Sequence, residues 1–557
     1  MTSDPRHASG THEVRNQPPP LEGADLYASD RVLREALAGL VSSGSVIDLR
    51  AYGRLAGGEL MDAGVPANRN RPELRTHDRF GRRIDTVEFH PAYHTLMAAA
   101  MAHGLHSRTW EPDAPGDALL TRSVLMYLHN QADAGTMCPV TMTHAAMPAL
   151  RGTTELAGKM EARLLARRHD PRDIPWWDKV GLTLGMGMTE KQGGSDVRAN
   201  QTVARPTAAG DYRLTGHKWF FSAPMSDAFL VLAQAPGGLS CFLLPRWRRD
   251  GTRNAIRIQR LKDKLGNWSN ASAEVEFLAA EAYPVGAEGD GIQRILPMVI
   301  RTRLDCMIGS ASLMRQAVSQ ALHHCRFRHA FGKPLVEQPL MRNVLADLAL
   351  ESEAALLLWL RVAHASASAA SEPKEAALAR IGTAIGKFWI CKRAPALVHE
   401  AQECLGGNGY VEECILPRLY REAPVNSIWE GSGNVQCLDV LRALEREPAC
   451  LDALQGMLAS GTGRHPLYDE WWEGMSSRLG PKRDNPATAR RLVAELALGL
   501  QACLFLQRGP EDAADAFCRG RLGHRGLVFG DLPADVNLPG IIARAMPEAE
   551  PERRWTA

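Results

Sequence analysis

Two segments far apart in the chain carry residues whose types could do chemistry. The first, residues 185–200, reads GMGMTEKQGGSDVRAN, with a glycine pair just before Ser195 and Asp196. Glycine permits positive φ angles and a close approach of a ligand to the main chain. Ser and Asp also suit an ordinary turn, and short glycine-rich patterns arise often by chance. Taken alone, this segment predicts a loop that enters a strand, with a ligand-holding loop as the alternative.

The second segment, NSIWEGSGNVQ, places Glu430 between Trp429 and Gly431 among apolar and small residues. A carboxylate in a water-poor pocket has a pKa above its reference of about 4.3, which suits a general base. A helix cap or a solvent-facing residue is the alternative.

Three further segments could contact a flat or phosphorylated ligand. In GHKWFFSAP an aromatic run precedes Ser222. The aromatic rings could stack on a flat ligand and the Ser222 hydroxyl could donate a hydrogen bond to it, although aromatic residues in strands usually lie in the core. In RFRHAFGKPLVEQPL, Arg328 could bind a diphosphate through its planar fork or offset a helix dipole. The glycines of ECLGGNGYVEECILPRLYRE lack the GxGxxG spacing and the preceding strand of a dinucleotide-binding fold, so we exclude that fold.

Composition bounds the classes of protein that are possible. A chain of 557 residues is too long for one core, so about three or four domains are expected. The net charge of +2 neither demands nor excludes nucleic acid. The 11 cysteines include no CxxC pair and predict buried thiols in a reducing compartment. His323 and His324 are adjacent on a predicted helix and point to different sides, so we expect no metal site. No apolar run reaches the length of a membrane span, and no signal segment opens the chain, so we expect a cytoplasmic protein.

The elements that must position these residues change character along the chain. Helical spacing of apolar residues dominates from Pro91 to about Leu184, after an irregular start. Period-two alternation, as in AIRIQR and AEVEF, then predicts a small antiparallel sandwich or barrel, and helical spacing returns after it as an antiparallel bundle. We therefore predict an α+β fold with four domains: an N-terminal arm and helical domain, a central antiparallel β domain, a helical bundle and a C-terminal helical extension, at residues 1–184, 185–291, 292–447 and 448–557.

Together these segments resemble the acyl-CoA dehydrogenases, a family of flavoproteins. GMTEKQGGSDVRA resembles the first signature of the family and ECLGGNGYVEECILPRLYRE the second, while RHAFGKPLVEQ and IWEGSGNVQ match in order and spacing. This resemblance covers roughly Pro91 to Glu447. Segments such as NQPPPLEGADLYASD, FHPAYHTLM and HKWFFSAPMSDAFLVLAQ extend it to the bacterial alkylation-response branch of the family, which also carries a C-terminal helical extension.

The resemblance implies bound FAD. Thr189 would meet the isoalloxazine edge and Ser195 the pyrophosphate, with aromatic residues and Ser222 over the ring. Arg328 and its neighbours would bind the adenine-diphosphate half of a flavin held mainly by another subunit, which implies a homotetramer. The complete expected set of FAD-binding residues is Met186, Met188, Thr189, Gly194, Ser195, Phe220, Phe221, Ser222, Arg328, Phe331, Gln338, Glu403, Gly406, Gly407, Trp429, Gly431, Ser432 and Asn434.

The resemblance also implies the α,β-dehydrogenation of a short or branched acyl-CoA. Glu430 would be the catalytic base, because the other position at which the family carries a base is here Thr302, next to Arg303, a candidate substrate contact. Two departures from the family pattern, Glu403 in place of Gln and Trp268 in place of a basic residue, affect details of cofactor or substrate contact. A flavin scaffold without turnover is a further hypothesis.

The resemblance to the alkylation-response branch also implies an alternative function, a flavoprotein that binds double-stranded DNA through the C-terminal section and protects DNA from alkylating agents or detoxifies them. Phosphate contacts drive such binding, but acidic residues interleave with the basic ones in the C-terminal section, as on an ordinary solvated helix face. The candidate contacts are Lys482, Arg483, Arg490, Arg491, Arg519, Arg521 and Arg525.

Overall fold

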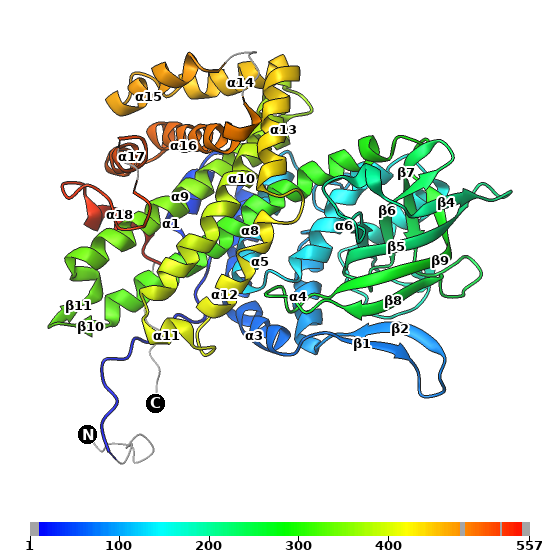
Figure 1. The fold of residues 1–557 in the computed structure, drawn as a ribbon. Helices are drawn as coiled ribbons and strands as arrows, with labels where there is room; N and C mark the ends of the chain where they lie inside the picture. Colours follow the sequence, from blue (N-terminus) through cyan, green and yellow to red (C-terminus); the bar gives the residue numbers. More distant parts are fainter. Residues whose placement is uncertain (1–10, 480–484, 524–525, 548–557) are drawn as a thin grey trace.

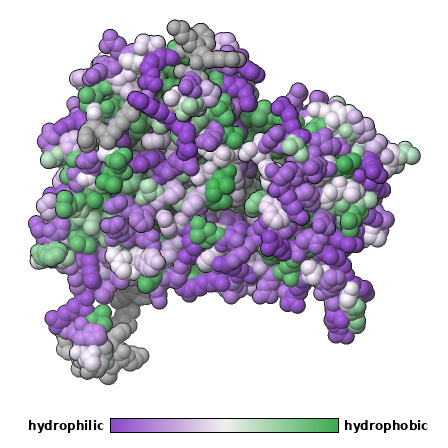
Figure 2. Space-filling view, in the orientation of Figure 1, coloured by the Kyte–Doolittle hydropathy of each residue, from purple (hydrophilic) through white to green (hydrophobic). Residues whose placement is uncertain are grey.

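The computed structural model describes residues 11–479, 485–523 and 526–547 (Figure 1). Helices make up most of the molecule, and a β domain lies at one side of them. Within the described residues, no helix combines the length and the apolar character needed to cross a membrane. Figure 2 shows a largely hydrophilic face with apolar groups scattered over the helical part. All eleven cysteines are free thiols and ten are buried, as the composition predicted.

The N-terminal region is more regular than its sequence suggested. The sequence predicted an irregular start, but helices begin at Arg31 and Ser43. Asp30 and Ser42 cap these helices, because each side chain accepts a hydrogen bond from a backbone N–H of the first turn. A two-stranded hairpin follows and projects from the body (Figure 1). The elements of this region are α1 (Arg31–Leu37), α2 (Ser43–Leu55), α3 (Met61–Arg69), β1 (Glu73–His77), β2 (Arg83–Glu88), α4 (Pro91–Ala102), α5 (Ala118–Ala132), α6 (Met137–Leu150) and α7 (Glu155–Leu164).

The β domain is a closed barrel. Strand β7 pairs with both β6 and β9, which closes the ring β6–β4–β5–β9–β7, while β3 pairs with β6 and β8 with β9. Phenylalanines with no exposed surface fill the interior. The predicted antiparallel β domain is confirmed except at two places, because β3 and β4 each pair with β6 in parallel. The strands are β3 (Leu184–Gly187), β4 (Val203–Pro206), β5 (Tyr212–Ser222), β6 (Ala228–Ala235), β7 (Gly238–Pro245), β8 (Ile256–Leu261) and β9 (Ser272–Pro284).

Three long helices, α8, α9 and α10, form the centre of the molecule (Figure 1). Helix α8 packs against α5 and α6 on one side and against α9 and α10 on the other, so one apolar core joins the N-terminal helices to the bundle. The elements after the barrel are α8 (Gly291–Phe327), β10 (His329–Ala330), β11 (Lys333–Pro334), α9 (Pro339–Ser368), α10 (Pro373–Glu403), α11 (Gly407–Tyr410), α12 (Leu416–Glu422) and α13 (Gly433–Arg446).

The C-terminal section packs on the bundle through buried ion pairs. Helix α9 carries the buried acids Asp347, Glu351 and Glu353. Arg521 donates to Asp347 and to Glu351, the latter at 3.1 Å, and Arg544 donates to Glu353 at 2.9 Å. The helices of this section are α14 (Pro448–Ala459), α15 (Pro466–Ser476), α16 (Ala489–Arg508), α17 (Glu511–Cys518) and α18 (Leu538–Ala545).

This packing bears on the candidate DNA contacts. The side chain of Arg521 is only 15% exposed and both of its partners are buried carboxylates, so the expectation that it meets a DNA phosphate is wrong. Arg519 is bound to Asp535 and, at 3.4 Å, to Asp515. Lys482, Arg483 and Arg525 lie outside the described residues.

A buried polar junction ties the three parts of the molecule together. Asp133, at the end of α5, accepts hydrogen bonds from Asn68 of α3 at 2.8 Å and from Ser269 of the barrel at 2.9 Å. Glu422, at the end of α12, accepts from the backbone N–H of Asn267 at 2.7 Å. Burial, together with the nearby Asp133 carboxylate, raises the pKa of Glu422 to about 7.

The raised pKa of Glu422 predicts a pH-dependent stability. Because the folded chain favours the protonated acid, stability falls as the pH rises from about 4.5 through about 7. Glu422→Gln keeps an oxygen for the Asn267 N–H but cannot ionise. Relative to that variant, the wild type should lose on the order of 3 kcal/mol of unfolding free energy between about pH 5 and about pH 8.

Unfolding followed at both pH values for the two proteins, with the exposed Glu413→Gln as a control, measures this difference. Parallel pH profiles for wild type and Glu422→Gln would contradict the prediction.

Candidate active site

Glu430 lies in a strained turn between a short 3-10 segment and α13. Its φ is 58° and that of Gly431 is 92°, both in the left-handed region. A non-glycine residue held there costs of order 1–3 kcal/mol unless its surroundings fix it. The strain therefore points to a turn that the rest of the molecule holds in place.

Three buried or nearly buried side chains hold the carbonyl groups of this turn. Lys387 of α10 donates to the carbonyls of Trp429, at 2.8 Å, and Gly431. Gln436 donates to the carbonyls of Glu430 and Gly431, at 3.1 and 3.0 Å, and Arg303 donates to that of Glu430 at 3.0 Å. We call these three side chains, Lys387, Arg303 and Gln436, the carbonyl clamp. Arg303 also binds Asp439 at 2.8 Å, so it supports the turn, and its expected contact with substrate has no support in this geometry.

The Glu430 carboxyl group faces α8. Thr302 donates to Oε2 of Glu430 at 2.6 Å. Burial raises the pKa of Glu430, although the Thr302 hydroxyl and the Lys387 and Arg303 cations oppose the rise. A desolvated carboxyl group with a raised pKa, oriented by one hydrogen bond, has the properties of a general base.

The glycine-rich turn at residues 189–196 rests on a fully buried ion pair. Lys218 donates to Glu190 at 2.8 Å, and neither side chain is exposed. Despite the opposing effect of burial, the Lys218 cation and backbone N–H groups lower the pKa of Glu190 to about 2. In the same turn Gly194 and Ser195 are exposed. A side chain at position 194 would not fit, because a Cβ on Gly194 would come within 2.3 Å of the Thr189 hydroxyl oxygen. The turn therefore has an exposed main chain that a buried ion pair holds in place.

The aromatic run before Ser222 divides between the two faces of β5. Phe220 is 52% exposed, whereas Phe221 has no exposed surface and packs in the barrel core against Phe229. The expectation that Phe221 covers a flavin is therefore wrong, because successive residues of a strand point to opposite faces. Ser222 lies beside Ser272, with 3.2 Å between their hydroxyl oxygens.

Some of the expected residues come together and others do not. Met186, Met188 and Trp429 pack against one apolar cluster, which joins the glycine-rich segment to the Glu430 turn. Ser432 is the N-cap of α13, and exposed Asn434 accepts from Arg490 at 3.3 Å.

The second group of expected residues lies at the far end of the bundle, around β10, β11 and α11, away from the barrel (Figure 1). There Phe331 is 96% exposed, Arg328 donates to the carbonyl of Asn16 at 2.6 Å, and Gln338 donates to that of Ala330 at 2.8 Å. Glu403, Gly406 and Gly407 are exposed there too.

Sequence reasoning missed Lys218, Lys387 and Gln436. A single lysine inside an apolar helical stretch, as in AIGKFWI, was the available signal, because such a charge needs a partner when it is buried. The partners of Lys387 are backbone carbonyls, which no sequence pattern identifies.

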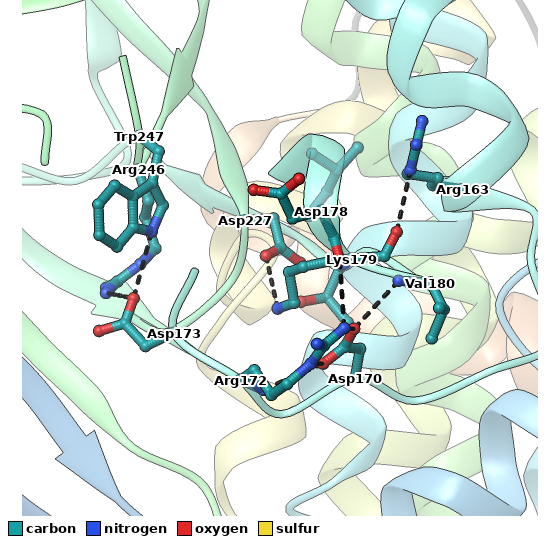
Figure 3. Close-up of polar contacts among 12 residues, drawn as sticks. Arg163, Asp170, Arg172, Asp173, Asp178, Lys179, Val180, Asp227, Arg246 and Trp247 are labelled. Atoms are coloured by element: carbon teal, nitrogen blue, oxygen red, sulfur yellow. Dashed lines mark hydrogen bonds and ion pairs between the residues drawn. The ribbon is translucent and has the colours of Figure 1, made fainter. Parts of the chain in front are cut away.

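A separate cavity of about 460 Å³ lies between the barrel and the N-terminal helices, lined by residues of β2, α4 and the loops at 169–183 and 223–227. Figure 3 shows the polar contacts of these loops, in which Lys179 binds Asp227 at 2.7 Å and Asp173 binds Arg246 at 2.8 Å. Glu430 and Thr189 do not line this cavity, so it is distinct from the candidate site.

Comparison with known proteins identifies the family. The model of the adaptive response protein AidB N-terminal domain matches residues 16–171, that of the acyl-CoA dehydrogenase middle domain matches 185–279, and that of its C-terminal domain matches 289–445. The AidB protein of Escherichia coli (strain K12), an acyl-CoA dehydrogenase by name, is 47% identical over 520 residues, which cover 93% of this chain and 96% of the relative. The chain belongs to the acyl-CoA dehydrogenase family.

Solved structures agree with this assignment. The Caenorhabditis elegans protein ACDH-11, solved in complex with C11-CoA, aligns with a TM-score of 0.83 at 26% identity and covers 93% of this chain and 95% of its own. A structure described as the apo-form of Bd2924 aligns with a TM-score of 0.81 at 28% identity and covers 88% of this chain and 99% of its own. As an acyl-CoA dehydrogenase, the protein is an FAD-dependent oxidoreductase of the type that acts on CH–CH groups.

The residues at the barrel edge fit a flavin. The exposed backbone at Gly194 and Ser195 can bind an anionic group. The exposed ring of Phe220 can stack on a flat ligand, and the Ser222 hydroxyl can donate a hydrogen bond. The Glu190–Lys218 pair fixes the turn that carries these groups.

Because the Glu190–Lys218 ion pair supports this turn, Lys218→Met should weaken FAD binding. The variant leaves the Glu190 carboxylate buried without its cation, which costs about 3–5 kcal/mol. We expect a lower melting temperature and a loss of most bound FAD, measured as the ratio of flavin to protein absorbance.

Glu190→Gln in the same chain should recover part of the stability, and Lys191→Met, at an exposed position of the same turn, is the matched control. Full FAD occupancy in Lys218→Met would show that the turn does not depend on this pair.

Proposed function

We propose that the protein catalyses the α,β-dehydrogenation of a short or branched acyl-CoA, with Glu430 as the catalytic base. The observation that carries this proposal is the desolvated carboxyl group of half-buried Glu430, bound by Thr302 at 2.6 Å, in a turn held in place by the carbonyl clamp. The binding of C11-CoA by ACDH-11, a protein of the same fold, supports an acyl-CoA as the class of substrate.

The chemistry requires a strong base in a dry site. The α-C–H of a thioester is a weak acid, so the carboxylate that removes its proton must be desolvated. Thr302 bonds Oε2 of Glu430 and leaves Oε1 for the α-proton. The backbone N–H of Glu430 has no acceptor within the described residues and can donate to the thioester oxygen, where negative charge develops. A bound FAD would supply the acceptor for the β-hydrogen, which leaves as hydride.

The flavin site is completed by a second copy of the chain. From the barrel, Thr189, Phe220 and Ser222 would hold the ring end of the flavin and Ser195 its pyrophosphate. Arg328, Phe331, Gln338, Glu403 and the glycines at 406 and 407 lie around β10, β11 and α11, at the end of the bundle away from the barrel (Figure 1). The exposure of Phe331, Glu403, Gly406 and Gly407 supports contact with the adenine half of a flavin bound mainly by a neighbouring subunit, in a homotetramer. We place this assembly in the cytoplasm.

Glu430→Gln tests the assigned base. The variant keeps the hydrogen bond from Thr302 but cannot accept the α-proton. We expect it to retain FAD and to lose anaerobic bleaching of the flavin by acyl-CoA, with a rate at least about a thousandfold below that of the wild type.

Absorbance during anaerobic titration with a panel of short and branched acyl-CoAs is the measurement, and Glu470→Gln, an exposed change in α15, is the control. A wild type that no acyl-CoA in the panel bleaches would exclude the dehydrogenase and leave a flavin scaffold as the hypothesis.

The DNA-binding alternative has less support. Of the arginines proposed for it, Arg490 and Arg491 are exposed, and Arg491 binds Glu495 at 3.0 Å. Together with the burial of Arg521, this leaves few free cations among the described candidates. A duplex-DNA shift that weakens steeply with salt and disappears in Arg490→Ala/Arg491→Ala would favour it.

A further inference from the structure

The N-terminal arm is fastened to the far end of α8 by Asn16. The side-chain amide of Asn16 exchanges two hydrogen bonds with the main chain of His329: Nδ2 donates to the His329 carbonyl and Oδ1 accepts from its N–H, each at 2.8 Å. Arg328 donates from one terminal nitrogen to the Asn16 carbonyl at 2.6 Å. One residue of the arm thus binds both residues that follow α8.

The conformation of Asn16 makes this double contact possible. Its φ is 57°, in the left-handed region, which asparagine adopts more readily than most residues. The amide has both a donor and an acceptor, so it can bind the N–H and the carbonyl of one residue at once. The three bonds together fix the side chain and the carbonyl of Asn16.

The residues after Asn16 limit how else the arm could attach. Pro18, Pro19 and Pro20 have no backbone N–H, and each ring holds φ at about −65°, so this part of the arm is extended and donates nothing to a neighbouring strand. Its second attachment is again through a carbonyl, that of Pro19, to which Nε2 of His323 donates at 2.8 Å. The arm is therefore held at two points on the end of α8.

The segment that Asn16 binds is itself anchored. His329 and Ala330 form β10, which pairs with β11, and Gln338 donates to the Ala330 carbonyl at 2.8 Å. An amide bound to the main chain of this hairpin has little freedom to move. The position of the Asn16 carbonyl is consequently set by the hairpin.

The arm uses only part of the Arg328 guanidinium. Within the described residues, Nε and the second terminal nitrogen of Arg328 have no hydrogen-bond or ion-pair partner. These donors lie in the planar fork that suits two oxygens of a phosphate. A long side chain that is already fixed loses less conformational freedom when it binds a ligand. The Asn16 carbonyl can therefore orient Arg328 and leave two of its nitrogens for an anion.

We propose that Asn16 is a positioning residue of the flavin site, which orients Arg328 toward the diphosphate of a flavin held mainly by a neighbouring subunit. This inference rests on the proposed function, in which Arg328 contacts that flavin. The N-terminal arm of one subunit then governs how tightly the next subunit retains its FAD.

Asn16→Gly tests the proposal. Glycine keeps the left-handed backbone and the carbonyl, but it removes both bonds to His329, so the carbonyl is no longer held beside Arg328. The full-length holoprotein is diluted in steps, and the dissociation constant of FAD is obtained from the absorbance of the bound and released flavin. The proteins compared are the wild type, Asn16→Gly, Arg328→Met and the double variant.

We expect the dissociation constant to rise about three- to tenfold in Asn16→Gly, the effect of losing one neutral hydrogen bond, and about ten- to hundredfold in Arg328→Met, the effect of losing a charged one. In the double variant Asn16→Gly should add less than about twofold, because a residue that acts through Arg328 has nothing left to orient. A role in structure alone would give additive losses.

Gln17→Gly is the matched control. Gln17 is the next residue of the arm, it is exposed, and within the described residues its side chain forms no hydrogen bond. This variant loosens the same segment and leaves the contacts of Asn16 in place, so it should bind FAD as the wild type does.

Unchanged or tighter FAD binding in Asn16→Gly, together with weaker binding in Arg328→Met, would overturn the inference and leave the shared flavin site intact. Additive losses in the double variant, or an equal loss in Gln17→Gly, would also overturn it. If Arg328→Met retains FAD as tightly as the wild type, the proposed placement of the flavin between two subunits fails, and the role of Asn16 fails with it.

Discussion

The candidate site depends on hydrogen bonds to three consecutive backbone carbonyls, those of Trp429, Glu430 and Gly431. Two cations and one amide from α8, α10 and α13 bind them, and the left-handed conformation of the turn persists because of these bonds. Lys387 and Arg303 donate to carbonyl groups of the turn and form no ion pair with the Glu430 carboxylate. The clamp can therefore fix the Glu430 backbone while its carboxyl group stays free to take up and release a proton.

The same principle, a buried charge satisfied by a partner from another element, organises the larger structure. The Glu190–Lys218 pair supports the glycine-rich turn, and the junction around Asp133 and Glu422 joins the N-terminal helices, the barrel and α12. Each contact crosses between elements that are distant in sequence. The positions of Thr189 and Glu430 relative to each other are consequently set by the packing of all three parts.

Much of the fold could be predicted from the sequence, because apolar periodicity reports local structure directly. The alternation in AIRIQR and AEVEF became β8 and β9, and the stretch RRLVAELALGLQACLFL became α16. Glu430 could be singled out from its apolar neighbours. Periodicity could not predict which residues of β5 face the barrel core, and so did not distinguish exposed Phe220 from buried Phe221. It also could not predict the distant partners of Lys387 and Arg521. Those depend on strand register or on contacts between residues far apart in the chain, and neither leaves a local pattern.

The attachment of the C-terminal section has a consequence for how the chain can be divided. Asp347, Glu351 and Glu353 belong to α9, in the centre of the bundle, but Arg521 and Arg544, which pair with these three acids, come from beyond Pro448. A chain cut at that point would remove Arg521 and Arg544 from these acids, although Arg393 of α10 would still bind Glu351, at 2.9 Å. Loss of any property in such a fragment would report on the integrity of the bundle and not on the removed section. Family members that naturally end near this position should carry uncharged residues at these three sites.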